Sequence, residues 1–280
     1  MKKKYREEYK EERLSIESTM GGPLWARATY SPTNPDILKD SQASEIIKKI
    51  DVDFSVAQEF CGEYLGINFI VRARKFDDAI KRFIKEFPNA TVVNIGCGLD
   101  TTFSRIDNGT IKWYDLDLPS AIEYRLKLIP ETKRSFCISK SMFDYSWFDD
   151  IEYDKKNGIF FFAAGVFNYF EENEISKLCI EIANRFPGGE LMFDVPSKLG
   201  LMILNRRIKK MGLDGMEMHF GLGSPVRQIS KWSDKIKVIE WYTLFDRIPR
   251  NLNWEKNTIR LMNLSDKFKI GKYVLLRFLN

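Results

Sequence analysis

Residues 90–100 read ATVVNIGCGLD, a short apolar run followed by two glycines on either side of a cysteine. A run of this kind, rich in β-branched residues, is typical of a buried strand. In an open parallel sheet, ligands bind beyond the carboxyl ends of the strands, near the point where the strand order reverses. Glycine tolerates a positive φ and lets a ligand approach the main chain. Gly96 and Gly98 therefore predict a ligand-binding loop directly after this strand.

Short apolar runs of the same kind recur along the chain, separated by segments with helical patterning. The segment 119–129 opens with a proline suited to a first helical turn, and 172–186 has apolar residues at helical spacing before Pro-Gly-Gly. Alternating strands and helices predict a mostly parallel sheet with right-handed crossovers. The predicted strands are 91–95, 111–117, 135–139, 158–163, 190–195, 235–245 and 272–279.

The two ends of the chain have a different pattern. The last two strands have no convincing helix between them, because PRNLNWEKNT (249–258) is full of turn residues, and an antiparallel, hairpin-like pair is expected. Residues 197–231 are predicted to be a helical insertion after the fifth strand, and residues 1–85 to be helical with a Gly- and Pro-rich break at 21–36. Since no repeat or linker is visible, we expect a single domain over 1–280, with a helical N-terminal lid region at 1–85 and a core at 86–280.

The composition excludes several classes of function. The net charge of +5, from 44 basic and 39 acidic residues, is too small and too dispersed to indicate nucleic acid. The sequence has no run of about eighteen uncharged apolar residues, so no membrane span is predicted. The charged opening MKKKYREEYKEER has no apolar segment after it and does not resemble a secretory signal, so we expect a cytoplasmic protein. The oligomeric state is not indicated.

No metal centre is predicted either. The four cysteines lie roughly forty residues apart without a C-x-x-C pair, and His219 is the only histidine. Reduced, structural thiols are the expected state. His219 is expected to be a surface or supporting residue beside the acceptor pocket, within the insertion.

The residues around the glycine loop discriminate between two cofactors. Thr101 stands where a dinucleotide fingerprint has its third glycine, and Asp100 would repel a pyrophosphate. About twenty residues further on, Asp115 and Asp117 close the next strand, where a carboxylate can accept hydrogen bonds from both ribose hydroxyls. S-adenosylmethionine has this ribose and no pyrophosphate, so it fits better than a nicotinamide cofactor. Upstream, Arg72 and Arg74 could bind its carboxylate, or could be surface residues of a helix.

Three motifs in this order resemble a known family. The segments VRARKFDDAI (71–80), VVNIGCGLDTTFSRI (92–106) and WYDLDLPSAI (113–122) are similar to the leucine carboxyl methyltransferases and the tetracenomycin-type polyketide O-methyltransferases, and so is 24–55. The likeness runs from about residue 20 to 195. It implies a Rossmann-like, class I methyltransferase α/β fold, whose seven-stranded, mostly parallel sheet has an antiparallel last strand.

The resemblance also implies which residues bind the cofactor, S-adenosylmethionine, whose product is S-adenosylhomocysteine. Arg72 would bind the methionyl carboxylate and Asp117 the ribose, with Arg74 and Asp115 as their alternatives. The residues that would line the methionine tail are Gly96, Cys97 and Gly98, with Cys97 a small residue that fits the turn.

Two positions depart from the family pattern. After the third strand, Ser141 replaces an acid; its oxygen, and the backbone of Met142, would contact the adenine. After the fourth strand, Ala164 replaces an acid that faces the cofactor in relatives. These replacements leave a second hypothesis open, a protein that binds S-adenosylmethionine without catalysis.

The methyl acceptor is expected to be a small molecule, polyketide-like or aromatic, with a carboxylate or a hydroxyl group. A carboxylate is already ionised at neutral pH, whereas a phenol has an unperturbed pKa of about 10 and would need a base. For an acidic acceptor, Arg27 in the lid and Tyr169 after the fourth strand are the candidate binding residues. No residue is predicted to be catalytic. A nicotinamide-dependent reductase is the remaining, disfavoured alternative.

Overall fold

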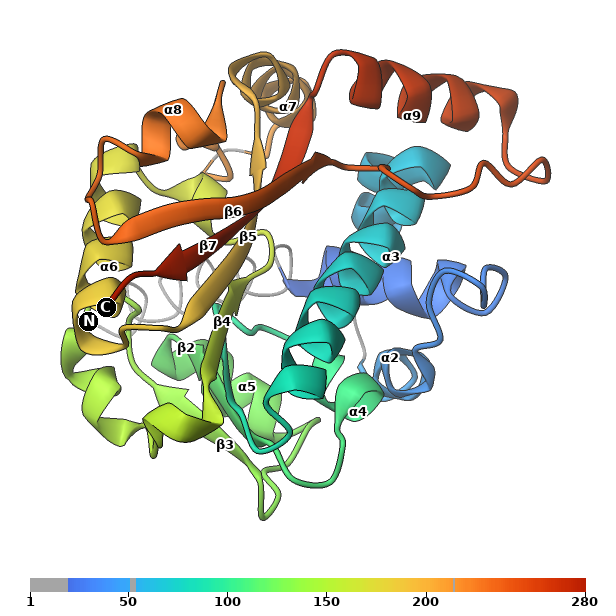
Figure 1. The fold of residues 1–280 in the computed structure, drawn as a ribbon. Helices are drawn as coiled ribbons and strands as arrows, with labels where there is room; N and C mark the ends of the chain where they lie inside the picture. The colour runs from blue at the N-terminus through green and yellow to red at the C-terminus, as the bar shows by residue number, and fades with distance from the viewer. Residues whose placement is uncertain (1–19, 51–53, 214) are drawn as a thin grey trace, which may run out of the picture.

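The computed structural model describes residues 20–50, 54–213 and 215–280. Its centre is a seven-stranded sheet in the order β3-β2-β1-β4-β5-β7-β6 (Figure 1). The strands β1 to β5 run parallel to one another, and β7 lies antiparallel between β5 and β6. The strands are β1 (Thr91–Ile95), β2 (Lys112–Asp117), β3 (Ser135–Ser139), β4 (Ile159–Ala163), β5 (Glu190–Pro196), β6 (Ile236–Thr243) and β7 (Gly271–Phe278). The predicted fold class and all seven predicted strands are confirmed.

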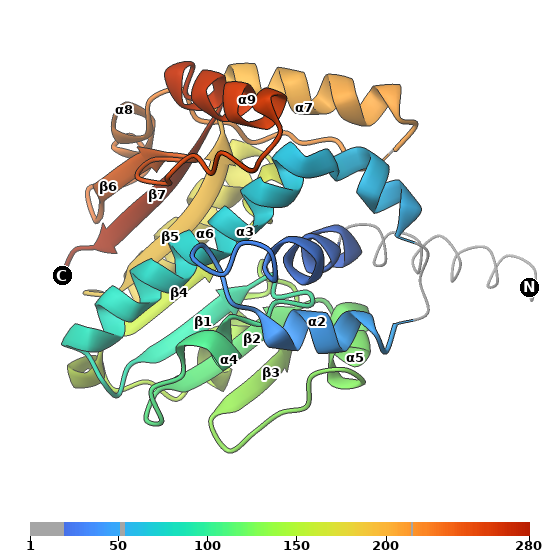
Figure 2. The same ribbon diagram turned by 90° about the vertical axis from the view of Figure 1, so that its right-hand side faces the viewer.

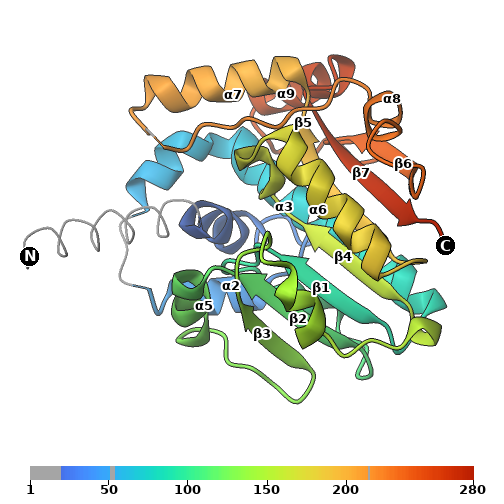
Figure 3. The same ribbon diagram turned by 90° about the vertical axis from the view of Figure 1, so that its left-hand side faces the viewer.

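Helices cover both faces of the sheet, with α3 and α6 on opposite sides (Figures 1 and 3). On one face, Phe76 and Ile80 of α3 pack against Val92 and Phe162 of the sheet. Both β1 and β4 are buried on both faces; β4 consists of apolar residues throughout, as a central parallel strand favours, and β1 also buries Thr91 and Asn94. The longer helices are α3 (Ser55–Glu86), which bends at Gly62, α6 (Glu172–Arg185), α7 (Lys198–Lys210) and α9 (Lys256–Lys267).

Short helices complete the connections between the strands. They are α2 (Ser41–Ile47), α4 (Thr102–Ile106), α5 (Pro119–Leu126), α8 (Pro225–Ile229) and the 3₁₀ helices η1 (Tyr145–Asp150), η2 (Lys155–Asn157) and η3 (Phe167–Tyr169). Residues 20–30 form a further helix, referred to as helix 20–30. Within the described parts of the chain, no helix is long and apolar enough to span a membrane.

Two predictions about helices are wrong. The stretch 21–36 is not a break, because helix 20–30 buries Leu24 and Ala26 and only the residues after it form turns. The last two strands do have a helix between them, α9, which begins at Lys256, inside the stretch 249–258, and buries Met262. The expected helical insertion is present as α7 and α8, whereas part of the predicted lid, residues 1–19, lies outside the described residues.

A buried lysine holds the insertion to the sheet. Lys272, in β7, is 1% exposed and donates to the carbonyl of Leu222 at 2.9 Å, in the segment between α7 and α8. Burial lowers the pKa of Lys272 to about 8, and the nearby positive charge of Lys269 makes a smaller contribution. The side-chain amine of Lys272 therefore takes up a proton less readily in the folded protein than in the unfolded chain.

This shift predicts how stability depends on pH. Between about pH 8 and the ordinary lysine value of 10.5, the unfolded chain binds more protons than the folded protein, so Lys272 makes the free energy of unfolding rise with pH. We expect Lys272→Met to remove this contribution in urea unfolding series at several pH values across that range. A variant with the same pH slope as the original protein would contradict the assignment.

Candidate functional site

The glycine loop after β1 depends on the absence of side chains at two positions. Gly96 has a φ of +68° and Gly98 a φ of +44°, both in the left-handed region that favours glycine. A Cβ on Gly96 would lie 2.5 Å from Val166 Cγ2, so the loop touches the turn after β4. A Cβ on Gly98 would lie 3.2 Å from Met20 of helix 20–30. The glycine loop is thus packed closely between the turn after β4 and helix 20–30.

Of the two acids in β2, only Asp117 lies at the loop. Its carboxylate, at the carboxyl end of the strand, accepts hydrogen bonds from the backbone amides of Gly98 and Leu118, each at 2.8 Å. Asp115 is 1% exposed and forms an ion pair with Arg125 at 2.7 Å. Asp115 is therefore engaged inside the fold, and Asp117 is the acid placed to meet a ribose.

Of the two predicted arginines, Arg72 lies at the site. It projects from α3 to the turn after β4, where a Cβ on Gly165 would be 2.3 Å from its Nη1. Its Nη1 also lies 3.6 Å from a carboxylate oxygen of Asp194, and its guanidinium lies over the ring of Phe69 at 4.8 Å. The contacts from Gly96 to Val166 and from Gly165 to Arg72 make one continuous surface across the ends of β1 and β4.

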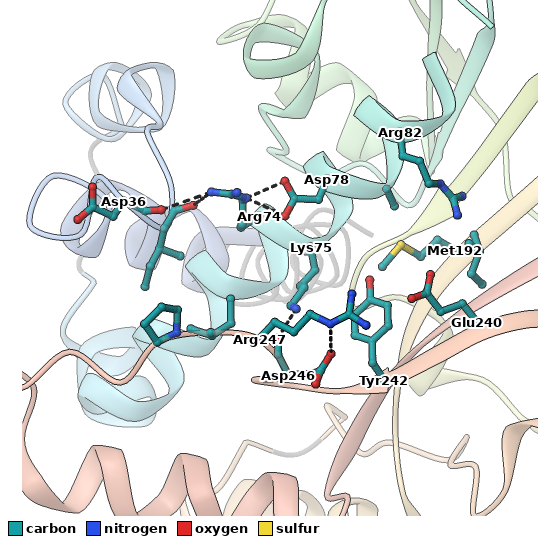
Figure 4. Close-up of a pocket in the computed structure, with 15 residues that line it drawn as sticks. Asp36, Arg74, Lys75, Asp78, Arg82, Met192, Glu240, Tyr242, Asp246 and Arg247 are labelled. Atoms are coloured by element: carbon teal, nitrogen blue, oxygen red, sulfur yellow. Dashed lines mark hydrogen bonds and ion pairs between the residues drawn. The ribbon is translucent and has the colours of Figure 1, made fainter. Parts of the chain in front are cut away.

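Arg74 points elsewhere, into a cavity of about 290 Å³ between α3 and the β6–β7 side of the sheet (Figure 4). Its Nε donates to both carboxylate oxygens of Asp78, at 2.7 and 2.8 Å. Lys75 donates to the carbonyl of Asp246 across the same cavity. The lining has no residue from the loops after β1, β2 or β4, and it contains the ion pairs Arg74–Asp78 and Arg247–Asp246. This cavity is separate from the glycine loop. Arg74, which lines the cavity, is therefore also away from the loop.

The other predicted cofactor residues lie at the ends of their strands. Ser141 follows β3, and its Oγ accepts a hydrogen bond from the backbone amide of Phe143 at 3.3 Å. The carbonyl of Met142 accepts Trp147 Nε1 at 3.0 Å. Ala164 follows β4 and is partly exposed.

Cys97 is a buried residue of the glycine loop, 4% exposed, and its backbone amide donates to Leu116. Burial raises the pKa of its thiol well above the ordinary value, which keeps the sulfur protonated and unreactive. All four cysteines are within the described residues and are free thiols.

Arg27 is engaged by the protein itself. It is 6% exposed, and it donates to a carboxylate oxygen of Asp40 at 3.0 Å and to the carbonyl of Leu99 at 2.8 Å. These bonds hold helix 20–30 against the glycine loop, and Figure 2 shows that helix beside the carboxyl ends of β1 and β2. A contact between Arg27 and the methyl acceptor stays a prediction.

Tyr169 and His219 lie beyond the carboxyl end of β4. Burial raises the pKa of Tyr169, so at neutral pH it offers a neutral hydroxyl, close enough to Arg72 and Asp194 for their charges to act on it. His219 is half exposed, with its Nδ1 3.5 Å from the carboxylate of Glu171. His219 is thus placed at the surface, as expected.

A buried polar network supports the glycine loop from beneath. Asp40, with a fully buried side chain, accepts hydrogen bonds from Arg27, from Thr101 Oγ1 at 2.7 Å and from Arg105 at 2.8 Å. Arg105 also forms two bonds of 2.9 Å with the carboxylate of Asp77 on α3. Thr101, which stands in the place of a third fingerprint glycine, therefore fixes the loop to Asp40, the residue before α2.

Asp194 is the site residue that the sequence interpretation missed. It lies in β5, and one of its carboxylate oxygens accepts the amide of Gly165 at 2.6 Å while the other faces Arg72. The only signal in the sequence was an acid near the end of a buried strand, in ELMFDVP (190–196). Its partner on α3 is far away in the sequence.

These features fit the cofactor implied by the motifs. The absence of a Cβ at Gly96 lets Val166 of the turn after β4 pack directly on the loop, and Asp117 holds the amide of Gly98 at the carboxyl end of β2. The guanidinium of Arg72 has one long ion pair, at 3.6 Å, which leaves its planar fork suited to a carboxylate. The site therefore combines groups for an amino-acid tail and a nucleoside.

The chain is similar to known proteins in sequence and in fold. A relative from Streptomyces glaucescens, the tetracenomycin polyketide synthesis O-methyltransferase TcmP, is 27% identical over 234 residues, which are 82% of this chain and 84% of the relative. A putative methyltransferase from Thermobifida fusca shares the fold, with 15% identity, a TM-score of 0.58 and coverage of 82% of this chain and 90% of its own. So does a DUF574 protein from Streptomyces avermitilis, with 12% identity, a TM-score of 0.59 and coverage of 85% and 95%.

The family model described as leucine carboxyl methyltransferase matches residues 22–183, more than half of the chain. The match includes the predicted cofactor residues from Arg72 to Ala164. The chain therefore belongs to the leucine carboxyl methyltransferase family, and with it to the S-adenosylmethionine-dependent methyltransferases.

Proposed function

We propose that this protein is an O-methyltransferase that methylates a carboxylate or hydroxyl group of a small polyketide-like or aromatic molecule. The observation that carries this proposal is the continuous surface formed by Arg72, Gly165, Val166 and Gly96, with Asp117 at its far end. The name of the Streptomyces relative, a polyketide O-methyltransferase, supports the acceptor class.

The predicted cofactor residues have separate proposed tasks. Arg72 would hold the methionyl carboxylate through two parallel hydrogen bonds, and Gly96 and Gly98 would admit the tail to the backbone. Asp117 would accept hydrogen bonds from the ribose, and Ser141, with the backbone of Met142, would contact the adenine. When bound, S-adenosylmethionine supplies a methyl group on a positively charged sulfur.

The remaining task of the protein is to position the acceptor. Methyl transfer is an in-line displacement, so the oxygen must be aligned with the methyl group and water must be excluded. Helix 20–30 lies against Gly98 through Met20 and closes one side of the site. Tyr169, as a neutral hydroxyl, would donate a hydrogen bond to an acidic acceptor, and Arg27 would add positive charge. A carboxylate acceptor would need no base.

A titration with S-adenosylhomocysteine and with NADPH tests the cofactor class. We expect S-adenosylhomocysteine to give saturable binding in isothermal calorimetry and to raise the melting temperature, because the site has groups for its amino-acid tail. We expect NADPH to do neither, since Asp100 and the missing third glycine disfavour a pyrophosphate. Saturable NADPH binding without any binding of S-adenosylhomocysteine would overturn the proposal.

A silent cofactor-binding protein is the second candidate, favoured by alanine at position 164 where relatives have an acid. Incubation with methyl-labelled donor and a panel of aromatic carboxylic acids and phenols separates the two. Transfer of label to a panel member supports the enzyme, and tight donor binding without transfer to any of them supports the silent protein.

A further inference from the structure

Arg72 and Asp194 place a cation and an anion side by side at the carboxyl ends of β4 and β5. Arg72 Nη1 lies 3.6 Å from one carboxylate oxygen of Asp194, longer than a normal hydrogen bond. The two side chains are 15% and 12% exposed, so solvent reaches both. The guanidinium and the carboxylate are therefore neighbours without the close, two-bond geometry of a mutually satisfied pair.

The carboxylate of Asp194 is fixed in place with one oxygen left over. Its Oδ1 accepts a hydrogen bond from the amide of Gly165 at 2.6 Å, and within residues 20–50, 54–213 and 215–280 its Oδ2 has only the long contact with Arg72. On β7, Tyr273 is paired directly opposite Asp194, and its hydroxyl is buried with no hydrogen-bond partner among the described residues. One carboxylate oxygen of Asp194 can therefore accept a further hydrogen bond, and the Tyr273 hydroxyl can donate one.

The other acids at this end of the sheet are engaged. Asp100 accepts the amide and the hydroxyl of Thr102, at 2.8 and 3.0 Å. Asp115 is paired with Arg125, and Asp117, which accepts two backbone amides, is the acid assigned to the ribose in the proposed site. Among the acids described here, Asp194 is the one whose carboxylate lies beside the carboxylate-binding arginine.

An α-amino acid has its ammonium one carbon away from its carboxylate, so a tail bound at Arg72 also brings a positive charge to this place. Residue 164, at the end of the neighbouring strand, is alanine and supplies no counter-charge. Phe193, just before Asp194, pairs with Ala163, so the Asp194 carboxylate lies one step further along the register, level with the turn after β4. We propose that Asp194 binds the α-ammonium of the methionine tail, so that Arg72 and Asp194 together recognise a zwitterion.

This inference rests on the proposed cofactor, and four ligands separate its parts. S-adenosylhomocysteine has both charges, its decarboxylated form has only the ammonium, its deaminated form has only the carboxylate, and 5′-methylthioadenosine has neither. In calorimetry with the full chain, Asp194→Asn is expected to weaken S-adenosylhomocysteine and the decarboxylated form by at least about tenfold each. The deaminated form and 5′-methylthioadenosine should bind the variant as they bind the original protein.

The matched control is Asp78→Asn, which removes a carboxylate from α3 beside Arg74, away from the glycine loop. It should leave all four affinities unchanged. If Asp194→Asn weakens the deaminated form as much as S-adenosylhomocysteine and spares the decarboxylated form, Asp194 only positions Arg72 and the proposal is wrong.

Two further outcomes are decided without the variant. The original protein should bind S-adenosylhomocysteine at least about tenfold more tightly than the deaminated form, and equal affinities would overturn the ammonium site even if Asp194→Asn failed to fold. No binding of S-adenosylhomocysteine by the original protein would instead refute the proposed cofactor itself.

Discussion

Replacing Arg72 with alanine is expected to weaken the binding of S-adenosylhomocysteine by more than about tenfold. The change would leave the tail carboxylate without a partner on a surface where the side chain is 15% exposed and water is a poor substitute. Arg72→Lys should recover only part of the loss, because an ammonium cannot form the two parallel bonds of a guanidinium. Isothermal calorimetry measures both effects directly.

Arg74→Ala is the matched control for this prediction. It removes a guanidinium only two residues away, but one that is bonded to Asp78 and lines the other cavity (Figure 4). Its affinity for S-adenosylhomocysteine should equal that of the original protein. A loss with Arg74→Ala and none with Arg72→Ala would move the carboxylate site to Arg74.

Asp40→Ala is expected to cost about 3–5 kcal/mol of folding free energy, the largest stability effect predicted for a single residue here. The substitution removes the shared acceptor of two buried guanidiniums, Arg27 and Arg105, and of the Thr101 hydroxyl. Urea unfolding followed by circular dichroism measures the change. Asp78→Ala is the control: its exposed ion pair with Arg74 should contribute less than about 1 kcal/mol.

The same carboxylate predicts a loss of stability in acid. Burial disfavours the charged form of Asp40, but Arg105 and Arg27 outweigh it and hold the pKa of the carboxyl below its ordinary value of 3.8. The stability that Asp40 contributes is therefore fully present above this value and is lost as the pH falls through the lower, folded pKa. In Asp40→Asn this acid-dependent part should disappear, and an unchanged acid profile would contradict the assignment.

Much of the fold could be predicted because its signals are local. Strands such as 91–95 and 159–163 are buried on both faces, and this burial selects apolar residues that are visible in the sequence. The helix α9 was missed because turn residues precede it and its buried face is narrow, with Met262 as its buried apolar residue. Helix 20–30 was missed because two glycines and a proline stand in its first turns.

The site could be predicted only in part, since its motifs do not fix the direction of side chains. Residues two apart on a helix point to nearly opposite sides, so either Arg72 or Arg74 could have faced the loop. The sequence also did not distinguish Asp115 from Asp117. In the structure Asp115 is buried in an ion pair with Arg125, whereas Asp117 reaches the glycine loop. The role of Asp194 could not be predicted, because its contact with Arg72 depends on how α3 and β5 lie relative to each other in the fold.

The position of β7 in the sheet has a consequence for the synthesis of the protein. β7 is made after β6 and α9, yet it lies between β5 and β6 and pairs with both. At about 5–20 residues per second, a ribosome needs roughly 4–15 s to advance from the end of β5 to the start of β7. Throughout that interval one edge of β5 has no partner strand, and an open apolar edge invites pairing with another chain. The last two of the seven strands therefore join the sheet only when β7 has been made, and the nascent protein is most exposed to aggregation, or most in need of a chaperone, during those seconds.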